Sequence, residues 1–299
     1  MSRPPWSQPL TRRWEARVRV LLVPNPANER SVDATRRAAE HLMALGYETV
    51  LVDEDAERCG LPLLGSVRAE IGTPELAVAL GGDGTILKAV HLLGVSATPV
   101  LGINLGRLGF LSGADGDGLL DALDCALAGE VRIERRQTLE ASVTAGGRAV
   151  GTYRALNELF VGRAGLARGV ELEIAVNGQS LYRAVCDGMV VATPTGSTAY
   201  ALSAGGPIVS PDVRGLIFVP VAAHALNLRS MVFAPSDVVT ISCPNPARAD
   251  ACVMADGDAV PCRTPLDSVE IRVSEHDVRL MKLDGRDFYS ALAGTFLGG

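Results

Sequence analysis

The hydrophobic pattern changes once along the chain. In the first part, short apolar runs alternate with segments whose apolar residues recur every three or four positions. Val18–Val23 and Tyr47–Val52 predict strands. Between them, residues 31–46 predict a helix, with Ser31 as its N-cap and Gly46 at its stop. Strands joined by a helix in this way build a parallel sheet, so we expect an α/β fold in this part.

A glycine loop follows the next strand directly. The apolar run Leu76–Leu80 ends in Gly81-Gly82-Asp83-Gly84-Thr85, and a helical pattern begins at Ile86. Strand, tight loop and helix start in this order are how α/β folds bind phosphate, because backbone N–H groups and the positive end of the helix dipole meet there. The candidate phosphate contacts are Gly81, Gly82, Gly84 and Thr85.

Asp83 is unusual in such a loop. A carboxylate among phosphate-facing amides repels phosphate unless a metal ion or a reacting hydroxyl group lies between them. This favours phosphoryl transfer, in which an Asp accepts the proton of an attacking alcohol. The structural alternative is a plain turn in which Asp83 caps the helix.

A second glycine-rich segment, Pro99–Leu111, has two interpretations. It is either a core strand with a wide turn, or a loop opposite the first one in which Asn104 and Arg107 face a ligand. Leu119–Ala128 then predicts a helix that closes the first domain, with Gly129 just past its end.

From about Val131 short alternating runs dominate, which is typical of antiparallel β structure. Asn177-Gly178 between two such runs predicts a two-residue hairpin, and Ala145-Gly146-Gly147 marks another. Asp287–Leu297 predicts a short helix that returns to the first domain. The expected fold class is α/β plus β: a doubly wound α/β domain at residues 16–131 with 276–299, and a β-rich domain at residues 132–275. Residues 1–15 are expected to form a disordered arm.

Two segments of the β-rich part carry candidate chemistry. Asn157-Glu158 lies inside an apolar run, where adjacent side chains point to opposite faces, so a shared role requires a bulge or a strand end; a polar edge position is the simpler interpretation. Asp187–Tyr200 ends a strand in small hydroxyl residues. Ser197 or Thr198 is expected to cap a helix that stops at Gly205, either as an ordinary cap or as a site for a sugar or diphosphate.

Composition excludes several classes of protein. The net charge is −6 and no basic cluster stands out, so nucleic acid is not an expected partner. No apolar stretch approaches the roughly 20 residues that span a bilayer, and the first residues lack the apolar core of a secretory signal, so we expect a cytoplasmic protein with no membrane partner. The six cysteines and four histidines show no metal-ligand spacing, and buried free thiols are the better interpretation.

Four segments in this order resemble the NAD kinase family of bacterial type. They are GGDGTILKA from Gly81, LGINLGRLGFL from Leu101, Asn157-Glu158, and DGMVVATPTGSTAYALSAGGPI from Asp187. The first is shared with lipid kinases and phosphofructokinases, whereas TPTGSTAY downstream of it is highly specific. The resemblance covers nearly the whole chain.

The resemblance implies transfer of a phosphoryl group from ATP or polyphosphate to the 2′-hydroxyl of the adenosine ribose of NAD, giving NADP. Asp83 would be the general base, and Mg²⁺ would arrive with the donor, with no protein residue named as a metal ligand. Family members are typically homodimers or homotetramers. The implied nucleotide-binding residues are Asp83, Gly84, Lys88, Asn157, Glu158, Arg168, Asp187, Thr198, Ala199, Tyr200, Ala201, Leu202 and Ser203.

The chain departs from the family pattern in two places. Ser230 stands where members tend to have proline, and Asp258 follows Asp256-Gly257. His224, near the first departure, could contact a ligand or pack as a structural histidine. Two other hypotheses remain: a lipid or sugar kinase, which leaves Thr193–Tyr200 without a role, and a non-catalytic dinucleotide sensor, which has little need for Asp83.

Overall fold

The structure is a computed structural model that describes residues 18–106, 109–165, 169–225, 227–262, 265–283 and 287–296. The expected N-terminal arm lies outside these ranges. The chain divides into two compact units: unit 1 takes the residues up to Arg135 and those from Val278 onward, and unit 2 is Arg136–Asp277. No helix in the described ranges is long and apolar enough to cross a bilayer.

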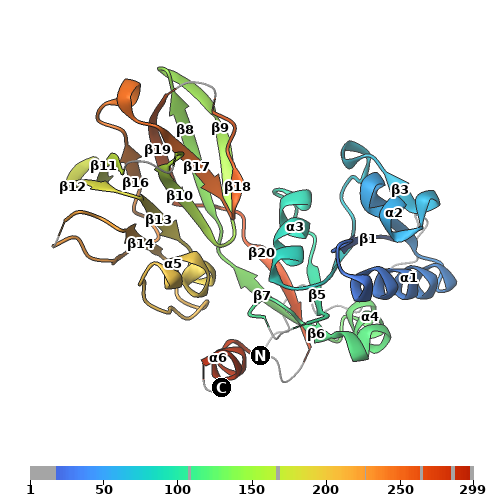
Figure 1. Cartoon of the computed structure of the whole chain (residues 1–299). Helices are drawn as coiled ribbons and strands as arrows, with labels where there is room; N and C mark the ends of the chain where they lie inside the picture. Colours follow the sequence, from blue (N-terminus) through green and yellow to red (C-terminus); the bar gives the residue numbers. More distant parts are fainter. Residues whose placement is uncertain are drawn as a thin grey trace. The chain divides into compact units, whose positions relative to one another are not determined.

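Unit 1 contains a sheet with strand order β3-β2-β1-β4-β5-β20-β7, in which β6 also pairs with β5 (Figure 1). The pairs from β3 to β20 are parallel. The order reverses between β1 and β4, so the doubly wound fold is confirmed and ligands are expected beyond the carboxyl ends of these strands. The strands are β1 (Arg19–Pro24), β2 (Glu48–Val52), β3 (Gly65–Ser66), β4 (Leu76–Leu80), β5 (Val100–Asn104), β6 (Ala114–Asp115), β7 (Arg132–Arg136) and β20 (Val278–Lys282).

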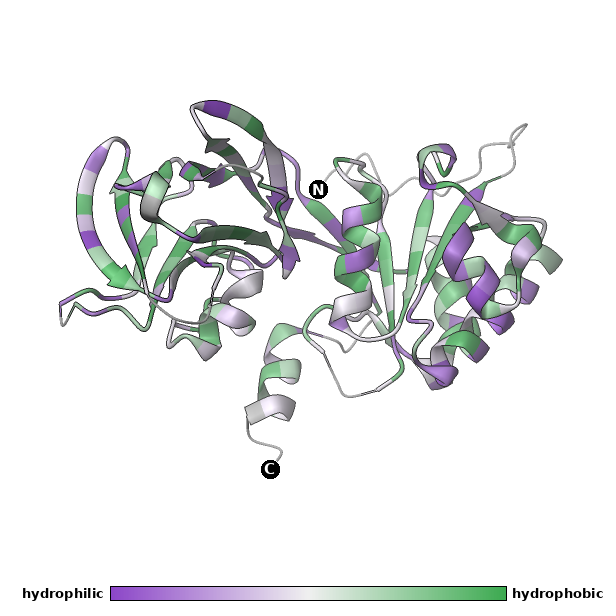
Figure 2. Ribbon diagram, turned by 45° about the horizontal axis from the view of Figure 1, so that its top comes forward, coloured by the Kyte–Doolittle hydropathy of each residue, from purple (hydrophilic) through white to green (hydrophobic). Residues whose placement is uncertain are grey.

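The helices of unit 1 follow from amphipathic segments, because burial of one apolar face stabilises a helix more than propensity does. In Figure 2 the strands are mostly green, whereas the helices beside them carry purple residues as well. The predicted helix 119–128 is confirmed, and Gly129 ends it in a left-handed conformation with φ of 75°. The helices are α1 (Glu29–Ala44), α2 (Asp53–Cys59), α3 (Asp83–Leu93), α4 (Leu119–Ala128) and α6 (Phe288–Phe296), with 3₁₀ turns at Pro62–Leu64, Arg68–Glu70 and Gly116–Gly118.

Ser31 is not the N-cap of the first helix. Asn28 takes that position, and its side chain accepts a hydrogen bond from the Arg30 amide. Ser31 is fully buried one turn later, where its hydroxyl donates to the Leu80 carbonyl at 2.5 Å and accepts from the Asn25 amide at 2.8 Å. It therefore joins the ends of β1 and β4, the two strands at the reversal point.

Unit 2 consists of two antiparallel sheets, with strand orders β15-β14-β13-β10-β17-β18 and β12-β11-β16-β19-β8-β9. The expected β-rich character is confirmed. The elements are β8 (Leu139–Ala145), β9 (Arg148–Ala155), β10 (Glu158–Arg163), β11 (Val170–Val176), β12 (Gln179–Cys186), β13 (Gly188–Ala192), β14 (Leu216–Val221), β15 (Met231–Phe233), β16 (Val239–Ser242), β17 (Ala251–Ala255), β18 (Asp258–Ala259) and β19 (Leu266–Val273), with short helical turns at Thr195–Thr198, α5 (Tyr200–Ser203) and Pro246–Arg248.

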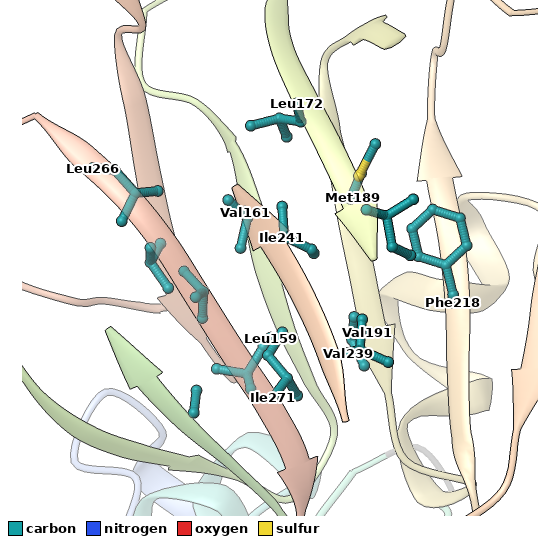
Figure 3. Close-up of a cluster of buried hydrophobic side chains, with 14 of the residues drawn as sticks. Leu159, Val161, Leu172, Met189, Val191, Phe218, Val239, Ile241, Leu266 and Ile271 are labelled. Atoms are coloured by element: carbon teal, nitrogen blue, oxygen red, sulfur yellow. The ribbon is translucent and has the colours of Figure 1, made fainter. Parts of the chain in front are cut away.

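The core of unit 2 lies between its two sheets. Leu159 and Val191 on one sheet and Ile241 and Ile271 on the other belong to a single buried cluster (Figure 3). Both predicted hairpins form, and Asn177 and Gly178 have φ of 50° and 79°, as a two-residue turn requires.

Candidate functional site

The glycine loop of unit 1 sits at the carboxyl end of β4. The Gly81 amide donates to the Ile103 carbonyl at 2.9 Å, and α3 begins two residues later with Gly82 at its N-cap. Within the described part of the chain, the amides of Gly82, Asp83 and Gly84 have no hydrogen-bond acceptor. Three adjacent N–H groups at a helix start are an arrangement that can bind an anion such as a phosphate group.

Asp83 does not cap α3. Its carboxylate turns to the second glycine-rich segment, where it accepts the Phe110 amide at 2.9 Å and the Leu111 amide at 3.2 Å. A Cβ atom at Gly109 would overlap this carboxylate, so only glycine permits the close approach. The second segment begins as a core strand, β5, as one interpretation held, and the amides of Phe110 and Leu111 farther along it hold Asp83. The other interpretation, a loop in which Asn104 and Arg107 face a ligand, stays a prediction.

Asn104 and Lys88 have protein partners. Asn104 is buried, and its side chain bonds the backbone of Gly106, which stabilises the turn. Arg107 lies outside the described residues. The Lys88 ammonium donates to both carboxylate oxygens of Asp55 at 2.7 Å, and 41% of the Lys88 side chain is exposed. Sequence reasoning gave no sign of Asp55, which the first turn of α2 brings here.

In unit 2, Asn157-Glu158 stands at a strand end, because β10 begins at Glu158. The carboxylate of Asp256 holds this turn: it accepts the amides of Leu156 at 2.7 Å, Asn157 at 2.7 Å and Glu158 at 3.1 Å. Asp256 was visible in the sequence as part of an Asp-Gly turn, but nothing there indicated that its carboxylate would bind a segment about 100 residues earlier.

The hydroxyl-rich segment packs against the same turn. The Thr193 amide donates to the Asn157 carbonyl at 2.8 Å, and its hydroxyl donates to the Leu156 carbonyl at 2.6 Å. A Cβ atom at Gly196 would overlap the backbone of Asn157. The structure therefore brings Asn157, Glu158 and the segment from Thr193 together.

The helix expected after this segment is shorter than the sequence suggested. A 3₁₀ turn at Thr195–Thr198 leads into a single helical turn, α5, whose N-cap Ala199 provides no side-chain cap. The Ser197 hydroxyl instead donates to the Pro194 carbonyl at 2.7 Å and accepts the Val209 amide at 3.0 Å, so the cap prediction was wrong. These bonds divert the hydroxyl from the helix start.

Of the residues from Thr198 to Ser203, some are buried and others accessible. Ala201 is fully buried, whereas Tyr200 is exposed and packs edge-on against Phe160, with ring centroids 5.7 Å apart. Ser203 is also exposed. Tyr200 and Ser203 therefore present accessible surface, while Ala201 anchors the turn.

Glu158 is an electrostatically unusual carboxyl group. It is only 9% exposed, and its Oε2 atom has no hydrogen-bond partner among the described residues. Burial raises its pKa to about 7, the nearby negative charge of Asp256 adds to the rise, and a hydrogen bond from the Tyr200 backbone opposes it. Near neutral pH a large fraction of this carboxyl is therefore neutral and can donate a hydrogen bond through its proton.

Asp187 lies away from this cluster. Strands β10 and β13 run antiparallel, with Glu158 opposite Ala192 and Gly162 opposite Gly188. Asp187 thus stands at the far end of β13, roughly 15 Å from the Asn157 turn. It forms an ion pair with Arg163 at 2.8 Å.

His224 and Arg168 are the two remaining candidate residues. His224 is exposed, which argues against a packed structural histidine. Arg168 lies outside the described residues. Within the described ranges, no group of three or more His, Cys, Asp or Glu side chains could hold a metal ion. Burial raises the pKa of the Cys186 and Cys243 thiols to about 11, so neither serves as a nucleophile.

Comparison with known proteins covers both units. The family model described as the ATP-NAD kinase N-terminal domain matches residues 20–131, and the ATP-NAD kinase C-terminal domain matches residues 156–283. An NAD kinase of Caldanaerobacter subterraneus is 35% identical to this chain, and the matched region covers 92% of this chain and 97% of that enzyme. An NAD kinase of Symbiobacterium thermophilum is 37% identical, and the matched region covers 93% of this chain and 98% of that enzyme.

Two solved structures share the fold. The yeast NADH kinase complexed with NADH superimposes with a TM-score of 0.85 at 24% identity, covering 99% of this chain and 92% of its own. The Archaeoglobus fulgidus NAD kinase in complex with ATP superimposes with a TM-score of 0.70 at 26% identity, covering 93% of this chain and 98% of that chain.

Proposed function

Because this chain belongs to the NAD kinase family, kinases that transfer phosphate to NAD, we propose that Asp83 is the base for phosphorylation of the adenosine-ribose 2′-hydroxyl. The single observation that carries this assignment is the Asp83 carboxylate fixed beside three acceptor-free amides at the start of α3. The amides suit the phosphates of the donor, ATP or polyphosphate, and the carboxylate suits an alcohol.

In the proposed phosphoryl transfer one bond forms, one breaks and one proton moves. The 2′-oxygen of NAD forms a bond to the terminal phosphorus of the donor, the bond from that phosphorus to its bridging oxygen breaks, and the hydroxyl proton passes to Asp83. An alcohol is too weak an acid to ionise beforehand, so the carboxylate mainly orients the hydroxyl and takes its proton late in a loose transition state. Two amides hold Asp83 and leave carboxylate lone pairs for this purpose.

Unit 2 supplies the dinucleotide-binding residues in this proposal. Asn157 and Glu158 bind ribose or adenine groups, with Glu158 as a hydrogen-bond donor when neutral. Thr198 to Ser203 line the same pocket through the accessible Tyr200 and Ser203. Asp187, at the far end of β13, contacts the nicotinamide end, which suits an extended dinucleotide.

Mg²⁺ enters this proposal with the donor. The described residues offer no cluster of carboxylates for a dedicated metal site, so donor phosphates and water would supply its ligands. The ion neutralises the charge of the phosphates when bound. From the family we also propose a cytoplasmic homodimer or homotetramer, which native mass spectrometry of the purified protein tests.

The deciding experiment measures NADP formation from NAD, ATP and Mg²⁺ with an NADP-specific dehydrogenase. Asp83→Asn keeps the size and one of the two amide contacts and removes the base, so kcat should fall about 1,000-fold with NAD binding retained. Polyphosphate in place of ATP, and NADH in place of NAD, run in parallel to identify donor and acceptor.

Other outcomes point elsewhere. Tight NAD binding without turnover by the wild type on either donor would favour a dinucleotide sensor. Failure to bind NAD at all would redirect the search to lipid and sugar acceptors. Unchanged turnover in Asp83→Asn would leave the kinase intact but remove Asp83 as its base.

A further inference from the structure

Lys282 occupies an unusual place in unit 1. It is one of only two lysines in a chain that has 26 arginines, and it is buried, with 4% of its surface exposed. It ends β20, which pairs in parallel with β5 through Leu280 and Met281. Burial of an ammonium group raises the free energy of the folded state unless the group forms hydrogen bonds, so the partners of Lys282 decide whether it can be buried.

The partners of Lys282 include the turn that holds Asp83. Its ammonium donates to the Ser112 carbonyl at 2.6 Å and to the Phe110 carbonyl at 3.3 Å. The Phe110 carbonyl and the Leu111 amide belong to one peptide group. Lys282 therefore binds the oxygen of that peptide group, and the N–H of the same peptide group, that of Leu111, donates to Asp83 at 3.2 Å.

A cation at the carbonyl oxygen polarises the peptide and strengthens its N–H as a donor, since hydrogen bonds in a chain reinforce one another. The contact also restrains the rotation of the peptide plane, which sets the direction of the N–H. From these contacts we infer that Lys282 is a positioning residue for Asp83, acting through the peptide between Phe110 and Leu111. The inference rests on the proposed role of Asp83 as the base.

The choice of lysine fits this role. An ammonium group is compact and has three donors that can diverge toward two carbonyls of one tight turn, whereas a guanidinium presents a planar fork. The turn also has backbone support that does not depend on Lys282: the Gly113 amide donates to the Gly102 carbonyl, and the Leu283 amide donates to the Gly113 carbonyl. Removal of the ammonium should therefore leave the strand in place.

The kinetic test compares Lys282→Met, which keeps the length and buries well, with Lys282→Arg, which keeps the charge. For Lys282→Met we expect kcat to fall about 10- to 100-fold with little change in KM for NAD, because the base is misdirected while the dinucleotide residues are intact. Lys282→Arg should recover part of kcat. If Lys282→Met loses thermal stability while its folded fraction keeps the wild-type kcat, the role is structural and the inference is wrong.

A second readout does not need turnover. In protein labelled with [¹⁵N]leucine, the Leu111 amide resonance is assigned through Leu111→Ile. We expect its proton signal to move upfield both in Lys282→Met and in Asp83→Ala, because each change weakens the same N–H···O bond from one side. If both variants show these shifts but the wild type forms no NADP, the proposed function is refuted and the Lys282 contact is retained. A Leu111 signal unchanged in Lys282→Met would overturn the inference itself.

Discussion

Asp83 follows the end of β4 and Glu158 begins β10, yet the surroundings of these two carboxyl groups differ in burial and in hydrogen-bond partners. Asp83 is half-buried, and each of its oxygens accepts a backbone amide. Glu158 is nearly fully buried, one of its oxygens finds no partner in the described structure, and a second carboxylate, Asp256, lies close by.

The difference teaches how the surroundings of a carboxyl group set whether it accepts or donates hydrogen bonds. Asp83 is partly exposed and accepts hydrogen bonds from two backbone amides. Burial and a neighbouring negative charge keep much of Glu158 neutral near pH 7, which suits a group that donates a hydrogen bond to a ligand. Changes on each side of this contrast should therefore have different signatures.

The largest expected effect is that of Asp256→Ala. Three amides lose a charged acceptor at once, and the free energy of unfolding should fall by about 4 kcal/mol, measured by urea denaturation. The KM for NAD should rise because the Asn157 turn loses its anchor. Asp258→Ala, at the exposed acid two residues on, is the matched control. Equal losses in both variants would mean that the three amide contacts contribute little.

The next effect is a change in the pH dependence of stability. The pKa of Glu158 is about 7 in the folded protein, above its unfolded value of 4.5, so the folded state binds more protons between these values and stability falls as pH rises through that window. Glu158→Gln should remove a loss on the order of 3 kcal/mol between pH 4.5 and pH 7. Denaturation curves at several pH values measure it.

Asp256→Asn sharpens this test. Burial is the larger cause of the raised pKa and the charge of Asp256 the smaller, so Asn at position 256 should lower the pKa of Glu158 only in part. A pH profile as flat as that of Glu158→Gln would show that the neighbouring charge, and not burial, controls the group.

Gly109→Ala should have the smallest effect of the three, about 100-fold in kcat, which corresponds to about 2.7 kcal/mol. The added Cβ overlaps the Asp83 carboxylate and must displace it. Gly106→Ala is the control, because a Cβ there meets no heavy atom within 4 Å. Steady-state kinetics of both variants decide the point: similar kcat values would indicate that Asp83 tolerates displacement.

Much of the fold was predictable because its signals are local. Alternation and periodicity identified the strands and helices, and Asn177-Gly178 fixed a hairpin through backbone conformations that few residues adopt. The glycine loop marked the turn from β4 into α3, because glycines end the apolar run of β4, although Gly82 itself has an ordinary φ of −86°. The family motifs extended this to candidate site residues.

Three of the misses share one physical cause: each depends on a partner far away in sequence. Ser31 is a residue type that favours the N-cap, but its hydroxyl donates a hydrogen bond to the Leu80 carbonyl, and Asn28 is the N-cap instead. The contacts of Asp256 and Lys282 join segments about 100 and 170 residues apart. Local patterns carry no information on such pairs until the strand order is known.

The position of β20 has a consequence for biosynthesis. This strand lies between β5 and β7, yet it emerges from the ribosome only after all of unit 2 has been made. The sheet of unit 1 must keep the edge of β5 open until then, and closing so long a loop costs entropy before any contact offsets it. A nascent chain stalled before Val278 would present an unpaired parallel strand, the kind of edge that chaperones shield and that otherwise aggregates.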